Sequence, residues 1–117
     1  MQNHNEICYI FLVIKIKKSD ISNGEGKIFP AETGHGIAVF HSENGEFSAF
    51  STDCPHLHCN VVWRGQDKTW LCPCHGSQFE ASGKLTRGPS EKNLAKLGVK
   101  DLGEEIGIQY DGREIHE

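Results

Sequence analysis

The sequence contains no apolar run long enough to cross a bilayer and no excess of basic residues. A membrane-spanning helix needs about 20 consecutive apolar residues, whereas the run Ile7–Ile14 reads only ICYIFLVI. The 12 basic and 16 acidic side chains give a formal net charge of −4, and a surface that binds nucleic acid needs clustered lysine and arginine. We therefore expect no membrane span within this chain and no nucleic-acid partner.

Helical periodicity and a dinucleotide fingerprint are also missing. No segment keeps a helical apolar period over 11 residues, apart from one possible turn near Glu91–Leu94. Gly24-Glu25-Gly26 opens no helical segment, so it is not the glycine-rich loop of a nucleotide site. No second group of histidine and carboxylate residues could form a mononuclear iron site. The chain is therefore not expected to be catalytic on a substrate by itself.

The sequence does contain short runs rich in β-branched and aromatic residues, separated by turn signals. Asn44-Gly45 separates two of these runs and the turn Gly65–Lys68 separates two more, so each pair is a predicted hairpin. The predicted strands are Ile37–Phe40, Phe47–Phe50, Val61–Trp63, Thr69–Leu71, Lys96–Lys100 and Ile106–Tyr110. This pattern predicts an all-β fold, a small antiparallel barrel or sandwich.

The apolar run near the N-terminus lies outside the main predicted domain. Residues 1–18 are predicted to be an N-terminal segment, and residues 19–117 one domain with one modest core. Ile7–Ile14 fits either a buried strand or a tail left from an upstream segment; the alternative is a short anchor or a partner-docking strand. The run lacks the basic start and small-residue cleavage site of a secretory signal, so we expect a cytoplasmic protein.

Cysteine and histidine gather in two short loops. Four of the five cysteines lie in the segments Cys54–Cys59 (CPHLHC) and Cys72–His75 (CPCH), at the same end of the second predicted hairpin. Two cysteines and two histidines suit a tetrahedral structural zinc site. The same donors suit a [2Fe–2S] cluster in which two thiolates hold one iron and two imidazoles hold the other. The residue types alone leave both interpretations open.

The spacing of these residues resembles the Rieske iron–sulfur family. The motif is Cys54-x-His56, fifteen intervening residues and Cys72-x-x-His75, followed by Gly76-Ser77-x-Phe79 and later by Gly88-Pro89. The resemblance covers the chain from about residue 19 to the end. It implies an antiparallel β-domain in which two loops form a cluster-binding subdomain, with a [2Fe–2S] cluster as the cofactor.

The resemblance also assigns roles to individual residues. Cys54 and Cys72 correspond to the ligands of the inner iron, and His56 and His75 to the ligands of the outer iron. The other correspondences are Cys59 and Cys74 for an inter-loop disulfide, Leu57 for a residue that shields the cluster, Ser77 for a hydroxyl donor to a cluster sulfur, and Gly88 and Pro89 for a loop that covers the far side of the cluster.

Two positions depart from the family pattern. His58 stands where disulfide-bearing relatives usually have glycine, and it is interpreted as an exposed imidazole beside the cluster; the alternative, His58 as ligand in place of His56, fits the spacing less well. Phe79 stands where high-potential respiratory relatives have a tyrosine. Since Phe79 lacks that hydroxyl, we expect a lower reduction potential than in those relatives, within a family range of about −150 to +300 mV.

The implied function is electron transfer. The chain is expected to transfer single electrons as a carrier or as the redox domain of a larger oxidoreductase, either FAD-linked or cytochrome bc-type, with a redox partner protein or domain. The order Gly24–Lys27, Ile37–Phe40 and then the first loop is more similar to the C-terminal Rieske domain of FAD-dependent oxidoreductases. Burial of Ile7–Ile14 as a strand of this same domain would argue against a former contact with a flavin domain.

Overall fold

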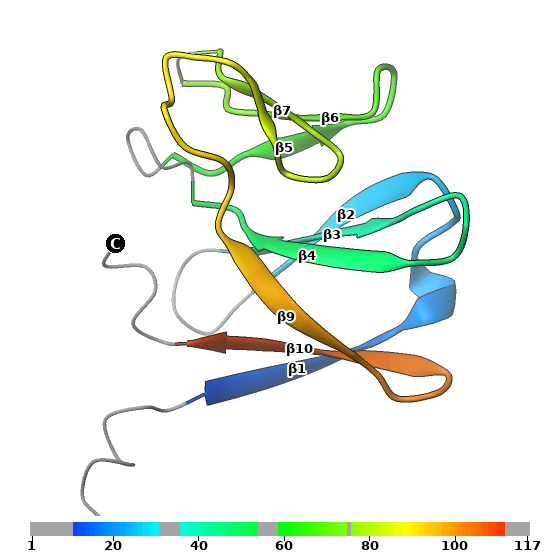
Figure 1. The fold of residues 1–117 in the computed structure, drawn as a ribbon. Helices are drawn as coiled ribbons and strands as arrows, with labels where there is room; N and C mark the ends of the chain where they lie inside the picture. Colours follow the sequence, from blue (N-terminus) through cyan, green and yellow to red (C-terminus); the bar gives the residue numbers. More distant parts are fainter. Residues whose placement is uncertain (1–10, 31–35, 54–58, 75, 112–117) are drawn as a thin grey trace, which may run out of the picture.

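The computed structural model describes residues 11–30, 36–53, 59–74 and 76–111, and these ranges form two antiparallel sheets (Figure 1). The six strands of the larger sheet have the order β1 (Phe11–Lys17), β10 (Glu105–Asp111), β9 (Lys96–Asp101), β4 (Phe47–Ser51), β3 (Gly36–His41) and β2 (Glu25–Pro30). The smaller sheet has the order β5 (Val62–Arg64), β6 (Thr69–Leu71), β7 (Gln78–Glu80) and β8 (Leu85–Arg87). A short 3₁₀ turn, Lys18–Asp20, follows β1. The all-β antiparallel architecture predicted from the sequence is confirmed.

Strands β3 and β4 form a wall between two hydrophobic cores. In Figure 1 the smaller sheet lies on one side of β2, β3 and β4, and β9, β10 and β1 lie on the other. Successive side chains of a strand point to opposite faces, so Ile37 and Val39 belong to one core and Ala38 to the other. All three are at most 1% exposed, which means that β3 is buried on both faces.

The two cores differ in composition. The first core is mainly aliphatic and contains Ile16, Ile21, Ile37, Val39, Ala49, Leu97, Ile106 and Ile108. The second core, under the smaller sheet, contains Ala38, Phe50, Val61, Trp70, Cys72, Phe79 and Leu94. Full burial of a large apolar side chain contributes about 1.5–3 kcal/mol. The aromatic side chains of Phe50, Trp70 and Phe79 therefore attach the smaller sheet to the larger one, and Cys72 is part of that contact.

The predicted hairpins and closing strands are confirmed. β3 pairs with β4 across the Asn44-Gly45 turn, where Gly45 has a φ of +94° that suits glycine. β5 pairs with β6 with Trp63 opposite Trp70. The predicted closing strands are β9 and β10, which pair with each other. In each case an alternating apolar pattern and a local turn signal coincide.

The one candidate helical turn in the sequence, near Glu91–Leu94, does not form. These residues have no helical structure. The Ser90 hydroxyl accepts a hydrogen bond from the Lys92 N–H and donates one to the Lys92 carbonyl, at 3.4 and 3.1 Å. The Leu94 N–H donates to the carbonyl of Gly83 at 2.9 Å. A serine side chain and a distant backbone carbonyl thus provide the bonds that a helix would have made locally.

Residues 11–17 of the N-terminal segment form a strand of the larger sheet. β1 pairs with β10 from Phe11 opposite Asp111 to Lys17 opposite Glu105. Ile16 is buried in the first core, and Ile14 packs against that core. This part of the segment is therefore continuous with the sheet, whereas residues 1–10 lie outside the described residues. Within the described ranges, no helix has the length and apolar character needed to span a bilayer.

Gly83 lies where the turn between β7 and β8 contacts the second core. Its φ is +87°, and a Cβ there would lie 2.5 Å from the Phe50 ring. We expect Gly83→Ala to lower the free energy of unfolding by about 1–3 kcal/mol more than Gly45→Ala, because overpacking is added to the strain of a positive φ. Gly45 is the matched control, since it has a positive φ and no atom within 4 Å of its Cβ position. Urea denaturation of both variants checks this, and equal losses would contradict it.

Candidate metal centre

The first cysteine-containing loop ends, and the second begins, at the same end of the smaller sheet. β5 and β6 pair with Val62 opposite Leu71. The first loop leads into β5 through Val61, and the second loop leaves β6 at Cys72. Because the paired strands hold these two positions side by side, the loops are brought together as the sequence predicts.

The base of the first loop is closed by backbone and side-chain hydrogen bonds. Asp53 and Asn60 form an isolated antiparallel bridge, and the Val61 N–H donates to the Thr52 carbonyl at 2.9 Å. The buried Thr52 hydroxyl accepts a hydrogen bond from the Gly36 N–H at 2.8 Å and donates to the Asn60 side-chain oxygen at 2.9 Å. These bonds fix the described chain on both sides of the first loop. The predicted site residues Cys54, His56 and Leu57, and the departing residue His58, lie outside the described residues.

The second loop is a tight turn closed on Cys72. The Cys72 N–H donates to the Ser77 carbonyl at 2.8 Å, and the Gly76 N–H donates to the Cys72 carbonyl at 2.9 Å. Gly76 has a φ of +84°, a backbone conformation that L side chains rarely adopt. The turn reverses the chain from β6 into β7. The predicted ligand His75 lies outside the described residues.

A disulfide joins Cys59 of the first loop to Cys74 of the second. The two Cα atoms are 6.5 Å apart, within the usual span of a disulfide. The inter-loop pairing implied by the family resemblance is confirmed. Because both sulfurs are oxidised, neither Cys59 nor Cys74 is a donor for a metal.

Cys72 remains as a free thiol and is the only free cysteine among the described residues. It is 1% exposed and packs in the second core with Val61, Trp70 and Phe79. A cysteine that binds a metal must be a free thiolate, and a surrounding apolar shell limits the access of solvent to such a site. The donor chemistry therefore fits the [2Fe–2S] group. The described residues alone contain no set of three potential metal ligands, since the three other predicted ligands lie outside them.

Ser77 and Ser90 connect the second loop to the segment that follows β8. Ser77 is fully buried, and its hydroxyl oxygen accepts a hydrogen bond from the Ser90 N–H at 2.9 Å. Gly88 and Pro89 are exposed, are joined by a cis peptide bond and directly precede Ser90. The predicted covering segment is thus attached to the loop that carries Cys72.

An ion pair and an aromatic contact hold the β5–β6 hairpin on β2. Lys68 Nζ donates to the Glu25 carboxylate at 2.9 Å and to the Gly24 carbonyl at 2.8 Å, and Trp63 Nε1 donates to Glu25 at 3.2 Å. The bond from Lys68, and then the bond from Trp63, lower the pKa of Glu25. Gly26 leaves room for the indole, because a Cβ there would lie 2.7 Å from the Trp63 ring. The hairpin that carries both loops is therefore fixed against the larger sheet.

Sequence reasoning missed several residues that build the site. Thr52 and Asn60 close the first loop, and Ser90 links the covering segment to Ser77. A serine directly after Gly88-Pro89 and a threonine two residues before Cys54 were visible in the sequence. Their function depends on contacts with residues 8 or 13 positions away in the chain, which no local pattern indicates.

A comparison with protein-family models matches residues 12–98 to the Rieske [2Fe–2S] domain. This match covers most of the chain. It includes both cysteine-containing loops, the hairpin between them and the Gly88-Pro89 segment.

Two relatives show the same similarity. The chain is 40% identical over 84 residues to the putative Rieske 2Fe–2S iron–sulfur protein YhfW of Bacillus subtilis (strain 168), which covers 72% of this chain and 16% of that protein. It is 33% identical over 92 residues to the cytochrome b6-f complex iron–sulfur subunit of Chlorobaculum thiosulfatiphilum, covering 79% of this chain and 50% of that subunit. The chain thus spans half or less of the length of these two relatives.

A solved structure shares the fold. The plasma membrane Rieske protein PetC3 from the cyanobacterium Synechocystis PCC 6803 superimposes with a TM-score of 0.73 at 25% identity. The match covers 83% of this chain and 99% of that protein. The likeness therefore includes both sheets rather than the loop region alone.

Proposed function

Because this chain belongs to the Rieske [2Fe–2S] family, we propose that it is a one-electron carrier module that works with a separate redox protein or domain. Its cofactor is a [2Fe–2S] cluster, which decides between the two metal chemistries left open by the sequence. When bound, such a cluster accepts and releases one electron at a time. The observation that carries the proposal is the free, buried Cys72 beside a disulfide that ties the two loops together.

The ligand assignment is part of this proposal. Cys54 and Cys72 would hold one iron as thiolates, and His56 and His75 would hold the other through imidazole nitrogens. Cys72 is supplied from the end of β6, where its backbone is fixed by bonds to Ser77 and Gly76. The apolar shell of the second core excludes water from the Cys72 side. Leu57, Gly88 and Pro89 are proposed to cover the rest of the group.

Ser77 has a separate role in the proposal. Its hydroxyl oxygen accepts the Ser90 N–H, and the described residues offer no acceptor for its own proton. The hydroxyl is therefore free to donate toward the metal group, which favours the reduced and more negatively charged state. Ser90 orients the hydroxyl, because its N–H occupies one side of the oxygen.

The choice of partner is also proposed. The similarity to iron–sulfur subunits of b6-f complexes supports an electron-transfer role of the bc-type. The alternative is an FAD-dependent oxidoreductase, supported by the order of motifs in the sequence. The packing of Ile14 and Ile16 against this domain's own core weighs against a contact of these residues with a flavin domain. A cytoplasmic location likewise stays a prediction.

The test is anaerobic purification, metal and sulfide analysis, and an EPR spectrum of the dithionite-reduced protein. We expect two irons and two inorganic sulfides per chain and the EPR signal of a mixed-ligand [2Fe–2S] centre. A colourless protein with one zinc and no sulfide would overturn the proposal in favour of a structural zinc module.

The reduction potential is expected to rise in Phe79→Tyr. Phe79 is fully buried in the same core as Cys72, so tyrosine adds a hydroxyl donor beside the metal-binding loop. A hydrogen bond that favours the reduced state by about 1 kcal/mol raises the midpoint by about 40 mV for one electron. Redox titration followed by EPR measures it. Phe47→Tyr, in a half-buried position of the first core, is the control, and an unchanged or lower midpoint in Phe79→Tyr would contradict the prediction.

A further inference from the structure

The positive charge of this acidic protein is concentrated in one segment. Residues 84–100 contain five basic side chains, Lys84, Arg87, Lys92, Lys96 and Lys100, and one acidic side chain, Glu91. The rest of the chain has seven basic and fifteen acidic side chains. The segment therefore differs in sign from the remainder of the molecule.

These five side chains are exposed, and their ion pairing can be compared with that of the other basic residues that the structure describes. Each lies at the surface, and none forms an ion pair with another described residue. By contrast, Lys18, Arg64 and Lys68 are paired with Asp101, Asp67 and Glu25. Within the described ranges, no carboxylate thus pairs with these five side chains, in contrast to the paired positions.

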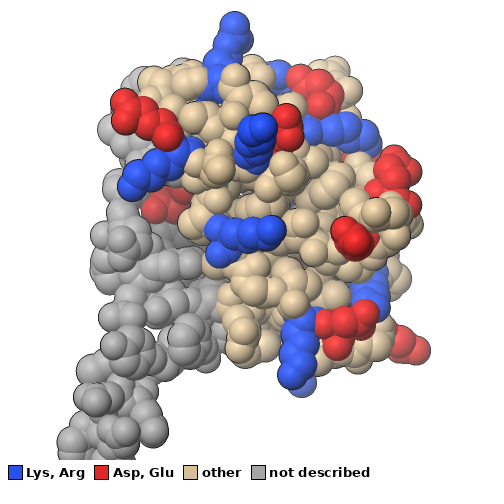
Figure 2. Space-filling view, in the orientation of Figure 1, with Lys and Arg blue, Asp and Glu red and all other residues tan. Residues whose placement is uncertain are grey.

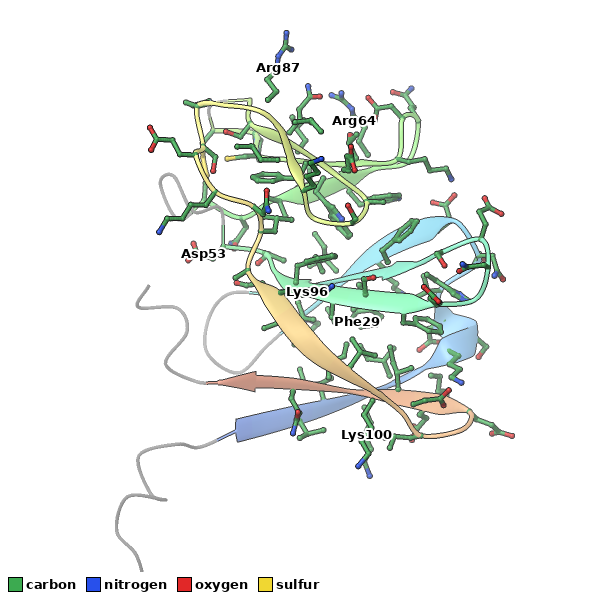
Figure 3. All side chains as sticks on the ribbon, viewed as in Figure 1. Phe29, Asp53, Arg64, Arg87, Lys96 and Lys100 are labelled. Atoms are coloured by element: carbon green, nitrogen blue, oxygen red, sulfur yellow. A yellow bond between two sulfur atoms is a disulfide. The ribbon has the colours of Figure 1, made fainter. Side chains whose placement is uncertain are left out.

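Strand geometry places two of the lysines on the outer surface of the larger sheet. Leu97 of β9 is buried in the first core. Since side chains alternate along a strand, Lys96 and Lys100 lie on the opposite face. Figure 3 labels Arg87, Lys96 and Lys100 one below the other from the smaller sheet to the lower edge of β9. Figure 2, in the same orientation, shows basic side chains down this face, with acidic side chains between and beside them.

This basic face, defined by Lys84, Arg87, Lys92, Lys96 and Lys100, adjoins the candidate metal centre. Arg87 directly precedes Gly88-Pro89, and Lys92 lies two residues after Ser90. The Ser90 N–H donates to the Ser77 hydroxyl inside the second loop. A partner that touches Arg87 and Lys92 would therefore also lie against the segment proposed to cover the metal group.

We propose that the basic face is the docking surface for an acidic one-electron redox protein. The inference rests on the proposed function, since it names the partner chemistry of the same centre. One electron passes between the docked partner's redox group and the centre, and the partner is oxidised or reduced by one electron in turn. Facing charges of opposite sign raise association rates about 10- to 1,000-fold, and salt weakens the effect.

A protein partner fits this face better than an anionic lipid surface. The described part of residues 84–100 exposes lysine and arginine but no aromatic side chain, and partly exposed Val99 is its main apolar contribution. Peripheral membrane segments usually combine basic residues with aromatic or large aliphatic side chains that insert among the lipids. The basic face also extends over both sheets, as a globular partner would require.

The test uses the intact cluster-loaded protein and an acidic flavodoxin as the probe. The second-order rate of electron transfer from flavodoxin hydroquinone is measured by stopped flow over a range of salt concentrations. We expect the rate to fall as salt rises, although the net charge of −4 alone predicts the opposite. The triple variant Arg87→Glu/Lys92→Glu/Lys96→Glu is expected to lower the low-salt rate by about tenfold or more.

The matched control reverses the exposed Lys27 of β2, Lys27→Glu, and is compared with the single variant Arg87→Glu, which changes the net charge equally. We expect the rate of Lys27→Glu to stay within about twofold of the parent, because β3 and β4 separate β2 from β9 and charges farther than a Debye length of about 10 Å are screened. An amide NMR titration with oxidised flavodoxin, in which no electron moves, should shift residues 84–100 in the parent protein.

Four outcomes would overturn the inference. The first two concern the electron-transfer rate, which would fall equally in the basic-face and control variants or would rise with salt. The other two are NMR shifts confined to surfaces outside residues 84–100, and tight binding to anionic phospholipid vesicles by a protein whose NMR spectrum flavodoxin does not change. A normal EPR spectrum together with any of these results would reject the docking surface alone. Absence of the cluster signal would instead reject the proposed function.

Discussion

Replacing Cys72 with serine is expected to remove the iron–sulfur cluster. Cys72 is free, 1% exposed and fixed by two backbone hydrogen bonds at the end of β6. A serine hydroxyl is protonated at neutral pH and is a poor iron ligand. Mutations beside metal ligands already cost 10- to 100-fold in affinity, so iron content should fall below about a tenth of the parent value. Iron analysis, the visible spectrum and the EPR spectrum measure this loss.

Cys8→Ser is the control for this prediction. Cys8 is remote in sequence from both loops, and its replacement should leave iron content and the EPR spectrum unchanged. Far-UV circular dichroism shows whether the strands persist in Cys72→Ser. A Cys72→Ser protein with two irons and two sulfides per chain would reject the ligand assignment.

Removing the disulfide is expected to have the largest effect on stability. The bond between Cys59 and Cys74 closes a loop with a sequence separation of 15, for which the chain-entropy model gives about 3 kcal/mol. The Cys59→Ser/Cys74→Ser protein should therefore unfold at a temperature lower by about 12 °C, since 1 kcal/mol corresponds to about 4 °C in a domain of a little over 100 residues. Thermal denaturation followed by circular dichroism checks the shift.

A thiol titration supports the same prediction. The denatured, cluster-free parent protein should show three reactive thiols, Cys8, Cys54 and Cys72, and five after reduction. The double variant should show three in both conditions. If the parent shows five thiols without reduction, or if the double variant melts at the parent temperature, the disulfide does not stabilise the protein.

Local patterns were sufficient to predict the two central hairpins. Asn44-Gly45 and the Gly65–Lys68 turn each stand between runs of β-branched and aromatic residues, and each pair of runs forms antiparallel strands. The convergence of the two loops follows from the second hairpin. The disulfide followed from the family resemblance, because spacing alone left several pairings open.

The rest of the architecture depends on contacts between distant segments. β7 and β8 have three residues each and are largely polar, so only the pairing of β7 with β6 and of β8 with β7 defines them as strands. The pairing of β1 with β10 joins the two ends of the described chain and has no local signature. The same is true of the Lys68–Glu25 ion pair, whose partners are 43 residues apart. The candidate helical turn at Glu91–Leu94 does not form, because the Ser90 hydroxyl and the Gly83 carbonyl bond its backbone groups instead.

The burial of β3 on both faces determines how the protein comes apart. Unfolding of the first core would expose Ile37 and Val39. Because these residues and Ala38 belong to the same strand, its displacement would also remove Ala38 from the second core. Neither core is expected to stay packed without the other, so unfolding should be cooperative across the whole domain. A destabilising substitution in the first core, which does not contain Cys72, should then release the cluster at the same temperature at which the sheets unfold.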